Sequence, residues 1–213
     1  MPAPRNQPPP TKRAPQQQRA LERIEAILGA TRAVLARDGY EGLTMVKIAA
    51  QAGITHTSIY HYFTSVEAIL TTLVSQLMHD FDQQVDAIVA RAETPLELVE
   101  ALLEGIELGF NMYRSNPVAR GLWAATRYLP ALRKIDDEDS ANNAQRFSDR
   151  FATLMPDCDR GAITTTTLLA TSLAVPAYEV ALTLDRNLQD RAIHDFLEMV
   201  RLRLLAVLAA PGN

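Results

Sequence analysis

The stretch GYEGLTMVKIAAQAGITHTSIYHYFTSVEAI, residues 39–69, decides how the N-terminal part of this chain folds. It predicts two short helices joined by a tight turn. Thr44 is placed to cap the first helix and Thr55 to cap the second. Gly53 lies between them and supplies the positive φ that a tight interhelical turn requires.

The two short helices are expected to bury one side and to expose the other. The expected inner residues are Val46, Ile48, Ala49, Ile54, Ile59 and Phe63. The expected outer residues of the second helix are Thr55, His56, Thr57, Ser58, Tyr60 and His61. Short hydrogen-bonding side chains on an exposed helix are typical of a helix that reads the DNA major groove. The predicted phosphate contacts, which position a protein without reading sequence, are Thr44, Lys47 and Tyr60.

One other interpretation of this stretch stays open. It is also compatible with an ordinary three-helix packing unit in which Tyr60 and Phe63 belong to the core. The turn glycine and the exposed polar side favour the DNA-reading interpretation. No metal site is expected, because His56 and His61 lie five residues apart without a carboxylate at ligand spacing.

These residues resemble the N-terminal helix-turn-helix of TetR-type bacterial transcriptional regulators. In that family, Thr-x-x-x-Ile-Ala-x-x-Ala-Gly-Val precedes a recognition helix ending in Tyr-x-x-Phe, and Ser-Lys-Glu follows. The matching residues within 24 positions are Thr44, Ile48, Ala49, Ala52, Gly53, Ile54, Tyr60, Phe63, Ser65 and Glu67. Val66 stands where the family commonly has a phosphate-contacting lysine, and Thr55-His56-Thr57 replaces the usual small-basic-glycine start. The resemblance therefore implies a DNA reader with its own base preference.

The resemblance, which is strong over residues 18–70, also implies how such a protein works. It implies a homodimeric repressor on a palindromic operator, released by a small, mostly apolar effector that binds a helical C-terminal domain. Two alternatives remain: a DNA-binding regulator without a small-molecule effector, and a helical enzyme or carrier that keeps the helix-turn-helix as a packing unit.

Helical periodicity and capping signals continue through the rest of the chain. Thr94-Pro95-Leu96-Glu97 is a capping box with proline at the first helical position. No alternating strand pattern appears, so an all-α fold of about nine helices is predicted. The expected later helices begin near Ser65, Thr94, Pro117, Pro130, Asp157 or Asp159, and Leu188, and the last ends near Ala209.

Charge divides the chain in two. Residues 1–64 hold eight Lys/Arg against four Asp/Glu, and residues 65–213 hold thirteen against twenty-one. A basic first third favours a polyanionic partner. The predicted organisation is a disordered, proline-rich basic arm over 1–15, a DNA-binding domain over 16–64 and a ligand-binding, dimerising domain over 65–213.

The composition excludes several classes of protein. The chain of 213 residues has no apolar run long enough for a membrane span and begins without a secretory stretch, so a cytoplasmic location is expected. Cys158 is the sole cysteine, which excludes an internal disulfide. No phosphate-binding loop, dinucleotide fingerprint or nucleophile elbow occurs, so neither catalysis nor a cofactor is expected.

The C-terminal helices suggest two further sites. The helices near 159–184 and 188–209 are more apolar than burial on one side requires, which favours a four-helix dimer interface over the central helices of a monomer. The residues expected at a ligand pocket are Phe110, Tyr113, Trp123, Tyr128 and Tyr178. Core packing is the simpler reading for each of them singly. The acidic run 136–139 is interpreted as a solvated helix surface.

Overall fold

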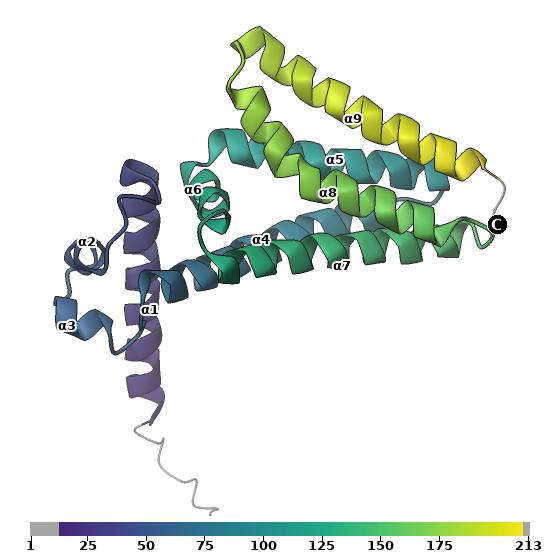
Figure 1. Ribbon diagram of the computed structural model, residues 1–213. Helices are drawn as coiled ribbons and strands as arrows, with labels where there is room; N and C mark the ends of the chain where they lie inside the picture. The colour runs from purple at the N-terminus through teal and green to yellow at the C-terminus, as the bar shows by residue number, and fades with distance from the viewer. Residues whose placement is uncertain (1–12, 211–213) are drawn as a thin grey trace, which may run out of the picture. The chain divides into compact units, whose positions relative to one another are not determined.

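A computed structural model of the chain describes residues 13–210, and within them it contains nine helices and no strand (Figure 1). The predicted all-α class is therefore confirmed. The helices are α1 (Arg13–Asp38), α2 (Met45–Gln51), α3 (His56–Ile59), α4 (Val66–Ala90), α5 (Pro95–Ser115), α6 (Pro117–Thr126), α7 (Pro130–Leu154), α8 (Arg160–Leu182) and α9 (Arg186–Ala209).

The chain forms two compact units, Met1–Ile69 and Leu70–Asn213, with the division inside α4. The basic arm expected over residues 1–15 lies outside the described residues, except for 13–15, which belong to α1. None of the helices described is both long and apolar enough to cross a membrane.

The N-terminal unit buries one apolar stripe from each of its helices. The buried side chains include Ile27, Leu28, Val34, Leu35, Met45, Ile48, Ala49, Ile59 and Phe63. The prediction for Val46 was wrong, because this side chain is 59% exposed. The buried stripe of α2 repeats at three and four residues, and Val46 lies about 200° around the helix from Ile48.

The predicted caps of this unit are confirmed by their hydrogen bonds. Thr44 Oγ1 accepts from the Lys47 amide at 3.2 Å, and Thr55 Oγ1 accepts from the Ser58 amide at 3.1 Å. The helix after Thr55 ends at Ile59, so Tyr60 and His61, which were expected on the outer side of this helix, follow its end. The Ile59 carbonyl accepts from the amides of residues 62 and 63, so the segment closes in turns.

The turn between α2 and α3 depends on Gly53, which has a φ of +66°. A Cβ added at Gly53 meets no atom within 4 Å, and the same holds for Gly29 inside α1. The two positions therefore differ in backbone conformation and not in available space.

This matched pair gives a stability prediction. Gly29→Ala is expected to stabilise the protein by about 0.5–1 kcal/mol, because alanine loses less backbone entropy in a helix. Gly53→Ala is expected to destabilise it by about 1–2 kcal/mol, because an L-residue is strained at positive φ. Urea unfolding of the two variants checks this, and a Gly53→Ala variant as stable as Gly29→Ala would contradict it.

The C-terminal unit is a stack of helices in which α7 packs on α8, α8 packs on α9, and α5 contacts both α8 and α9 (Figure 1). Its core includes Leu98, Leu102, Phe110, Leu122, Leu132, Phe147, Phe151, Ile163, Tyr178 and Leu204. The predicted capping signals are confirmed here also. Thr94 Oγ1 accepts from the Glu97 amide, while the Glu97 carboxylate accepts from the Glu93 amide. Asp159 caps α8 through the Ala162 amide.

Asn116 is the single residue between α5 and α6. Its backbone amide donates to the Met112 carbonyl at the end of α5. Its side-chain oxygen accepts from the amides of Val118 and Ala119 at the start of α6. Pro117 has no amide hydrogen and therefore fits the first helical position. One residue thus ends one helix and begins the next.

Candidate nucleic-acid interface and cavity

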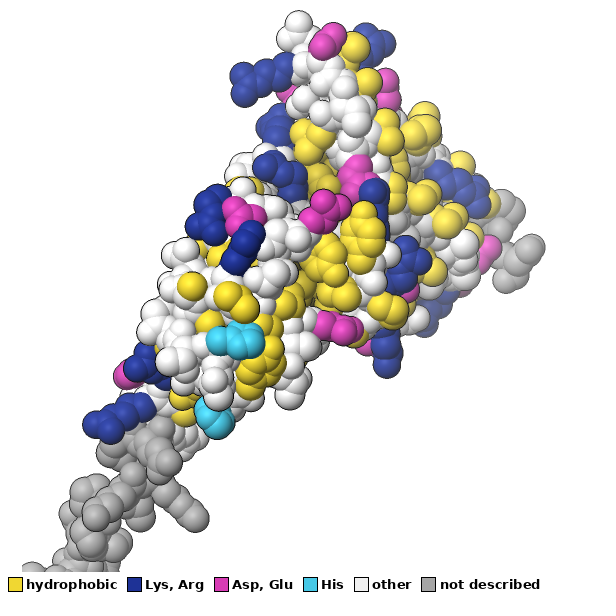
Figure 2. Space-filling model, turned by 60° about the vertical axis from the view of Figure 1, so that its left-hand side comes forward, with side chains coloured by type: hydrophobic (Ala, Val, Ile, Leu, Met, Phe, Trp, Pro, Cys, Tyr) yellow, Lys and Arg dark blue, Asp and Glu magenta, His cyan; other side chains and the backbone are white. Residues whose placement is uncertain are grey.

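The short helix α3 presents a polar surface. Thr55, His56, Thr57, Tyr60 and His61 are exposed, and Ser58 is half-buried. Only Ile59 of this helix is fully buried, and it holds the helix against the core of the unit. Figure 2 brings this side of the N-terminal unit forward, and histidine, basic and apolar side chains share the surface there.

The polar residues of α3 divide into two groups. The hydroxyls of Thr55 and Ser58 share a hydrogen bond of 2.7 Å as part of the helix cap. The rings of His56 and Tyr60 meet edge to face at 5.1 Å, with the Tyr60 hydroxyl 3.4 Å from His56 Nε2. The cap therefore engages Thr55 and Ser58, and His56 contacts Tyr60. The side chains of His56, Thr57, Tyr60 and His61 are all exposed.

Lys47 lies on α2 and forms an ion pair that the sequence did not indicate. Its ammonium is 3.1 Å from a carboxylate oxygen of Asp38, and the Arg37 guanidinium contacts the same carboxylate at 2.8 Å. The hydrogen bonds from Arg37 and Lys47 hold the pKa of Asp38 well below its ordinary value. One carboxylate therefore offsets the charge of two basic side chains beside α2.

This ion pair predicts that a substitution beside the expected DNA-binding surface strengthens DNA binding instead of weakening it. Asp38→Asn is expected to tighten binding to DNA of any sequence by roughly threefold to tenfold and to steepen its salt dependence, because two basic side chains lose a competing carboxylate. Fluorescence anisotropy on an unrelated duplex, over a range of salt concentrations, measures both quantities. Exposed Glu41→Gln is the control of equal charge change, and an equal effect of the two variants would contradict the specific role of Asp38.

The C-terminal unit contains a cavity of about 80 Å³, measured as the space open to the centre of a water molecule. Its lining comes from α4, α5, α6, α7 and α8 and is mostly apolar. Gly105 and Gly109 form part of its α5 wall. A Cβ at Gly109 would lie 2.8 Å from the Tyr178 hydroxyl, so glycine leaves room for that ring.

The structure brings four of the five residues that the sequence suggested for a pocket into one aromatic cluster. The Phe110 ring lies 5.6 Å from Tyr178, and the Tyr113 ring lies 5.6 Å from Trp123 and 5.9 Å from Tyr178. Their remaining surroundings differ. Trp123 and Tyr178 line the cavity. Phe110 packs against Tyr178 but faces a second groove, between α5 and α9. Tyr113 lines a shallow hollow beside Glu179. Tyr128 follows the end of α6 and is 62% exposed, outside the lining of the cavity.

The acidic run of α7 is not uniformly solvated, which corrects the sequence-based interpretation. Asp136 and Asp139 are half-buried and line the cavity, whereas Asp137 and Glu138 are exposed. A spacing of three residues puts the first two on one helix face. Ser140 and Asn143 continue that face along the cavity wall.

Burial changes the protonation of these carboxyl groups. Desolvation, together with the neighbouring carboxylate of Asp82, raises the pKa of Asp139 to about 7. Desolvation also raises the pKa of Asp136, although the Trp123 indole donates a hydrogen bond that opposes the shift. No group of three or more His, Cys, Asp or Glu among residues 13–210 is arranged to hold a metal ion.

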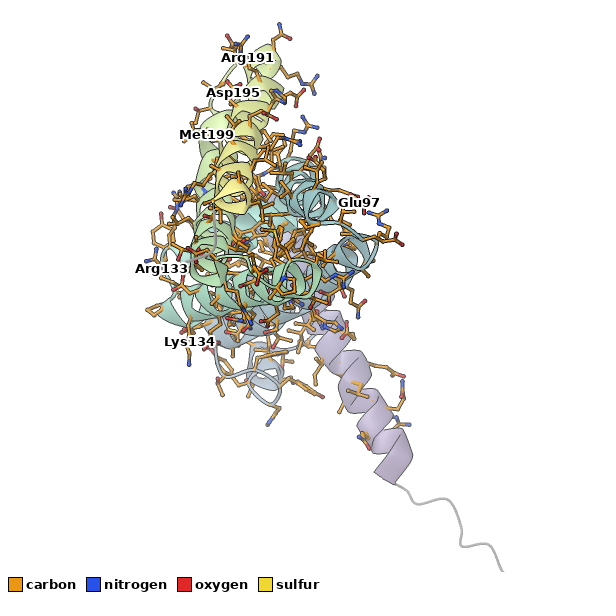
Figure 3. All side chains as sticks on the ribbon, turned by 90° about the vertical axis from the view of Figure 1, so that its right-hand side faces the viewer. Glu97, Arg133, Lys134, Arg191, Asp195 and Met199 are labelled. Atoms are coloured by element: carbon orange, nitrogen blue, oxygen red, sulfur yellow. The ribbon has the colours of Figure 1, made fainter. Side chains whose placement is uncertain are left out.

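The last two helices carry an exposed apolar face. Of the thirteen large hydrophobic side chains that are exposed in the described part of the chain, seven lie on α8 and α9. They are Leu168, Leu169, Leu173, Val180, Leu188, Met199 and Leu202. A shallow groove between the two helices is lined by small residues as well, including Gly161, Ala162 and Ala170. Figure 3 labels Arg191, Asp195 and Met199 along one side of α9.

Two family models match this chain. Residues 96–208 match the family described as tetracyclin repressor-like, C-terminal domain. Residues 27–73 match the family described as bacterial regulatory proteins, tetR family. The first match alone covers more than half of the chain. Together the two matches include α2, α3, nearly all of α5, α6 to α8 and most of α9, and they leave out residues 74–95, which hold most of α4.

Individual relatives agree with these matches. The chain is 30% identical over 115 residues to the HTH-type transcriptional regulator EthR of Mycolicibacterium smegmatis, covering 54% of this chain and only 52% of that regulator. It is 25% identical over 146 residues to the HTH-type transcriptional regulator BetI 2 of Chromohalobacter salexigens, covering 64% and 68%. A crystal structure of a TetR-family transcriptional regulator from Pectobacterium atrosepticum shares the fold, with a TM-score of 0.67, 19% identity, and coverage of 91% and 98%.

Proposed function

Because this chain belongs to the TetR family of bacterial regulatory proteins, we propose that it is a homodimeric transcriptional repressor. It binds a palindromic DNA operator through α3 and leaves that operator when a small, mostly apolar molecule occupies the cavity of the C-terminal unit. It acts in the cytoplasm, and we propose no catalytic activity.

The observation that carries this proposal is the exposed polar surface of α3. His56, Thr57 and His61 present hydrogen-bonding groups outward, while Ile59 fixes the helix to the core. A recognition helix in the major groove needs such groups for contact with base edges. Lys47 on α2 and Tyr60 after α3 would contact phosphates and set the position of the helix.

The apolar face of α8 and α9 supports the homodimer. A second copy of the chain would cover Leu169, Leu173 and Met199 with the same residues of its own, as a two-fold interface requires. Small residues along α8 would let the facing helices approach closely. A two-fold dimer presents two recognition helices, which explains the expected inverted repeat with half-sites about one helical turn, roughly 34–36 Å, apart.

The cavity supports release by a small molecule. A ligand that binds more tightly to the form unable to bind DNA shifts the protein towards that form. A coupling free energy of about 1–3 kcal/mol between the two sites would change operator affinity roughly 5-fold to 150-fold.

Selection of bound duplexes from a random DNA pool tests the proposal. The full chain is expected to enrich one inverted repeat, and His56→Ala or Thr57→Ala to change the enriched bases. Tyr60→Ala is expected to weaken binding to all sequences and to flatten the salt dependence. Recovery of no motif by the unaltered chain would overturn the proposal. An enriched motif without symmetry would overturn its homodimeric part.

A further inference from the structure

The cavity of the C-terminal unit has one acidic wall. Asp136 and Asp139 line it from adjacent turns of α7, and Asn143 donates a hydrogen bond of 3.0 Å to Asp139. Neither carboxylate forms an ion pair with a side chain of the described part of the protein. None of the described residues that line the cavity is lysine or arginine.

Two basic side chains act on this wall without forming an ion pair with it. Arg133 attracts the Asp136 carboxylate. Arg146, one turn beyond Asn143, pairs with Asp82 at 2.8 Å and with Asp86 at 3.0 Å, both on α4. The carboxylates of Asp82 and Asp136 therefore repel a negative charge on Asp139. The Arg146 guanidinium attracts it, but the same guanidinium is already paired with Asp82 and Asp86. The carboxylates of Asp82, Asp86, Asp136 and Asp139 outnumber the guanidinium groups of Arg133 and Arg146, so the charge around this end of the cavity is negative.

The remaining walls are aromatic and aliphatic. The aromatic side chains are Phe81, Trp123, Phe147 and Tyr178. The Tyr178 hydroxyl donates to the Ile106 carbonyl at 2.6 Å, and burial raises its pKa, so it contributes no charge. Aromatic faces beside carboxylates form the environment in which proteins hold organic ammonium ions. An anionic ligand would instead meet like charges, which disfavour it.

We propose that the cavity binds a compact organic ammonium ion, with its apolar body against the aromatic walls and its charged nitrogen at Asp136 and Asp139. This inference rests on the proposed function, because it names the chemical class of the effector. One water needs about 10–15 Å³, so the cavity of about 80 Å³ accommodates roughly five to eight groups of that size. A single ring with one amino group meets that limit.

The proposal predicts that binding depends on pH. Asp139 must be ionised to hold the cation, and its pKa is about 7. The titratable and charged groups that act on it are Asp82 of α4 and Asp136 and Arg146 of α7. Trp123 of α6 and Tyr178 of α8 line the same cavity. An ammonium ion should therefore bind roughly tenfold more weakly at pH 6 than at pH 8. A neutral ligand should show no such change.

Calorimetric titration of the full chain with cyclohexylamine and cyclohexanol tests the inference. The two probes have the same number of non-hydrogen atoms, and the amine stays protonated below pH 9 because alkylamines ionise near pH 10.4. At pH 8 the amine is expected to bind at least about tenfold more tightly than the alcohol. Equal affinities, tighter binding of the alcohol, or no binding of the amine would each overturn the inference.

Two variants that each remove one negative charge test whether the amine binds in the cavity or at the helix surface. Asp139→Asn is expected to weaken amine binding roughly tenfold and to leave cyclohexanol unchanged. Asp137→Asn, one helix position away from Asp136 but exposed, should leave both affinities as they are. Circular dichroism melting of each variant checks that it folds. An equal loss in both variants would show attraction to the helix surface and overturn the assignment to the cavity.

Operator binding is measured separately, so that the two proposals can fail separately. Amine selectivity without an enriched operator would overturn the proposed function and leave the cavity chemistry intact. Amine selectivity with an operator that the amine does not release would overturn the effector role. An operator bound by a protein that does not prefer the amine would overturn only the ammonium assignment.

Discussion

Replacing both Leu173 and Met199 by aspartate is expected to make the protein monomeric and to weaken operator binding roughly a hundredfold or more. These side chains are 51% and 63% exposed on the face of α8 and α9 that the proposed partner covers. Each large apolar side chain buried at an interface contributes about 1.5–3 kcal/mol, and an aspartate there would lose hydration without a partner. Linking two DNA-binding modules raises overall affinity by about 10²–10⁴, and a monomer forfeits that gain.

Sedimentation equilibrium and anisotropy on the selected operator measure the two effects. Leu96→Asp is the control, because Leu96 is 56% exposed on α5, outside this face. The control should remain dimeric and bind the operator normally. A double variant that stays dimeric would show that α8 and α9 do not form the interface. A monomer with unchanged affinity would show that dimerisation does not contribute to operator binding.

Replacing Asp139 by asparagine is expected to stabilise the protein at pH 8 and to have less effect at pH 5. The carboxyl pKa rises from 3.8 to about 7 on folding, so the folded state binds more protons than the unfolded state across that interval. The free energy of unfolding of the unaltered chain therefore falls as pH rises from about 4 to about 7 and is level above it. Asparagine does not titrate and avoids this loss.

The expected gain at pH 8 is on the order of 1–2 kcal/mol, because solvent around a half-buried group screens part of the shift. Thermal melts of the variant and of Asp137→Asn at the two pH values measure it. The control should show no dependence of its stability change on pH. An Asp139→Asn variant that is equally stabilised at both pH values, or destabilised at pH 8, would contradict a desolvated carboxyl group at this position.

The features that the sequence predicted well are local ones. Thr44, Thr55 and Thr94 cap their helices as expected, and Asp159 is the cap among the two candidates Asp157 and Asp159, because a cap depends on a few consecutive residues. Gly53 takes the expected positive φ for the same reason. The expectation that Tyr60 and His61 belong to the second helix was wrong, because the end of so short a helix depends on the hydrogen bonds of one or two residues.

The cavity was harder to predict, because its lining depends on how several helices cross. Tyr128 is aromatic and near the right helices, yet the end of α6 leaves it exposed. Asp136 and Asp139 looked like solvated charge, although their spacing with Asn143 already places all three on one side of α7. Helical spacing therefore indicated that these three side chains share one side of α7. It did not indicate which residues of the other helices line the cavity opposite them. The ion pair between Lys47 and Asp38 was not predictable from the sequence either, because it depends on how α1 and α2 cross.

Because Asn116 is the single residue between α5 and α6, a change in its backbone angles would tilt α6 as a rigid body about this point. Trp123 lies six residues from Pro117, about 9 Å along the helix axis. A sideways displacement of its ring by ~1.6 Å then corresponds to a tilt of α6 of ~10° about that point. The indole lines the cavity and hydrogen-bonds to Asp136. If the cavity binds the proposed effector, a ligand that displaced this ring would therefore change the direction of the whole helix.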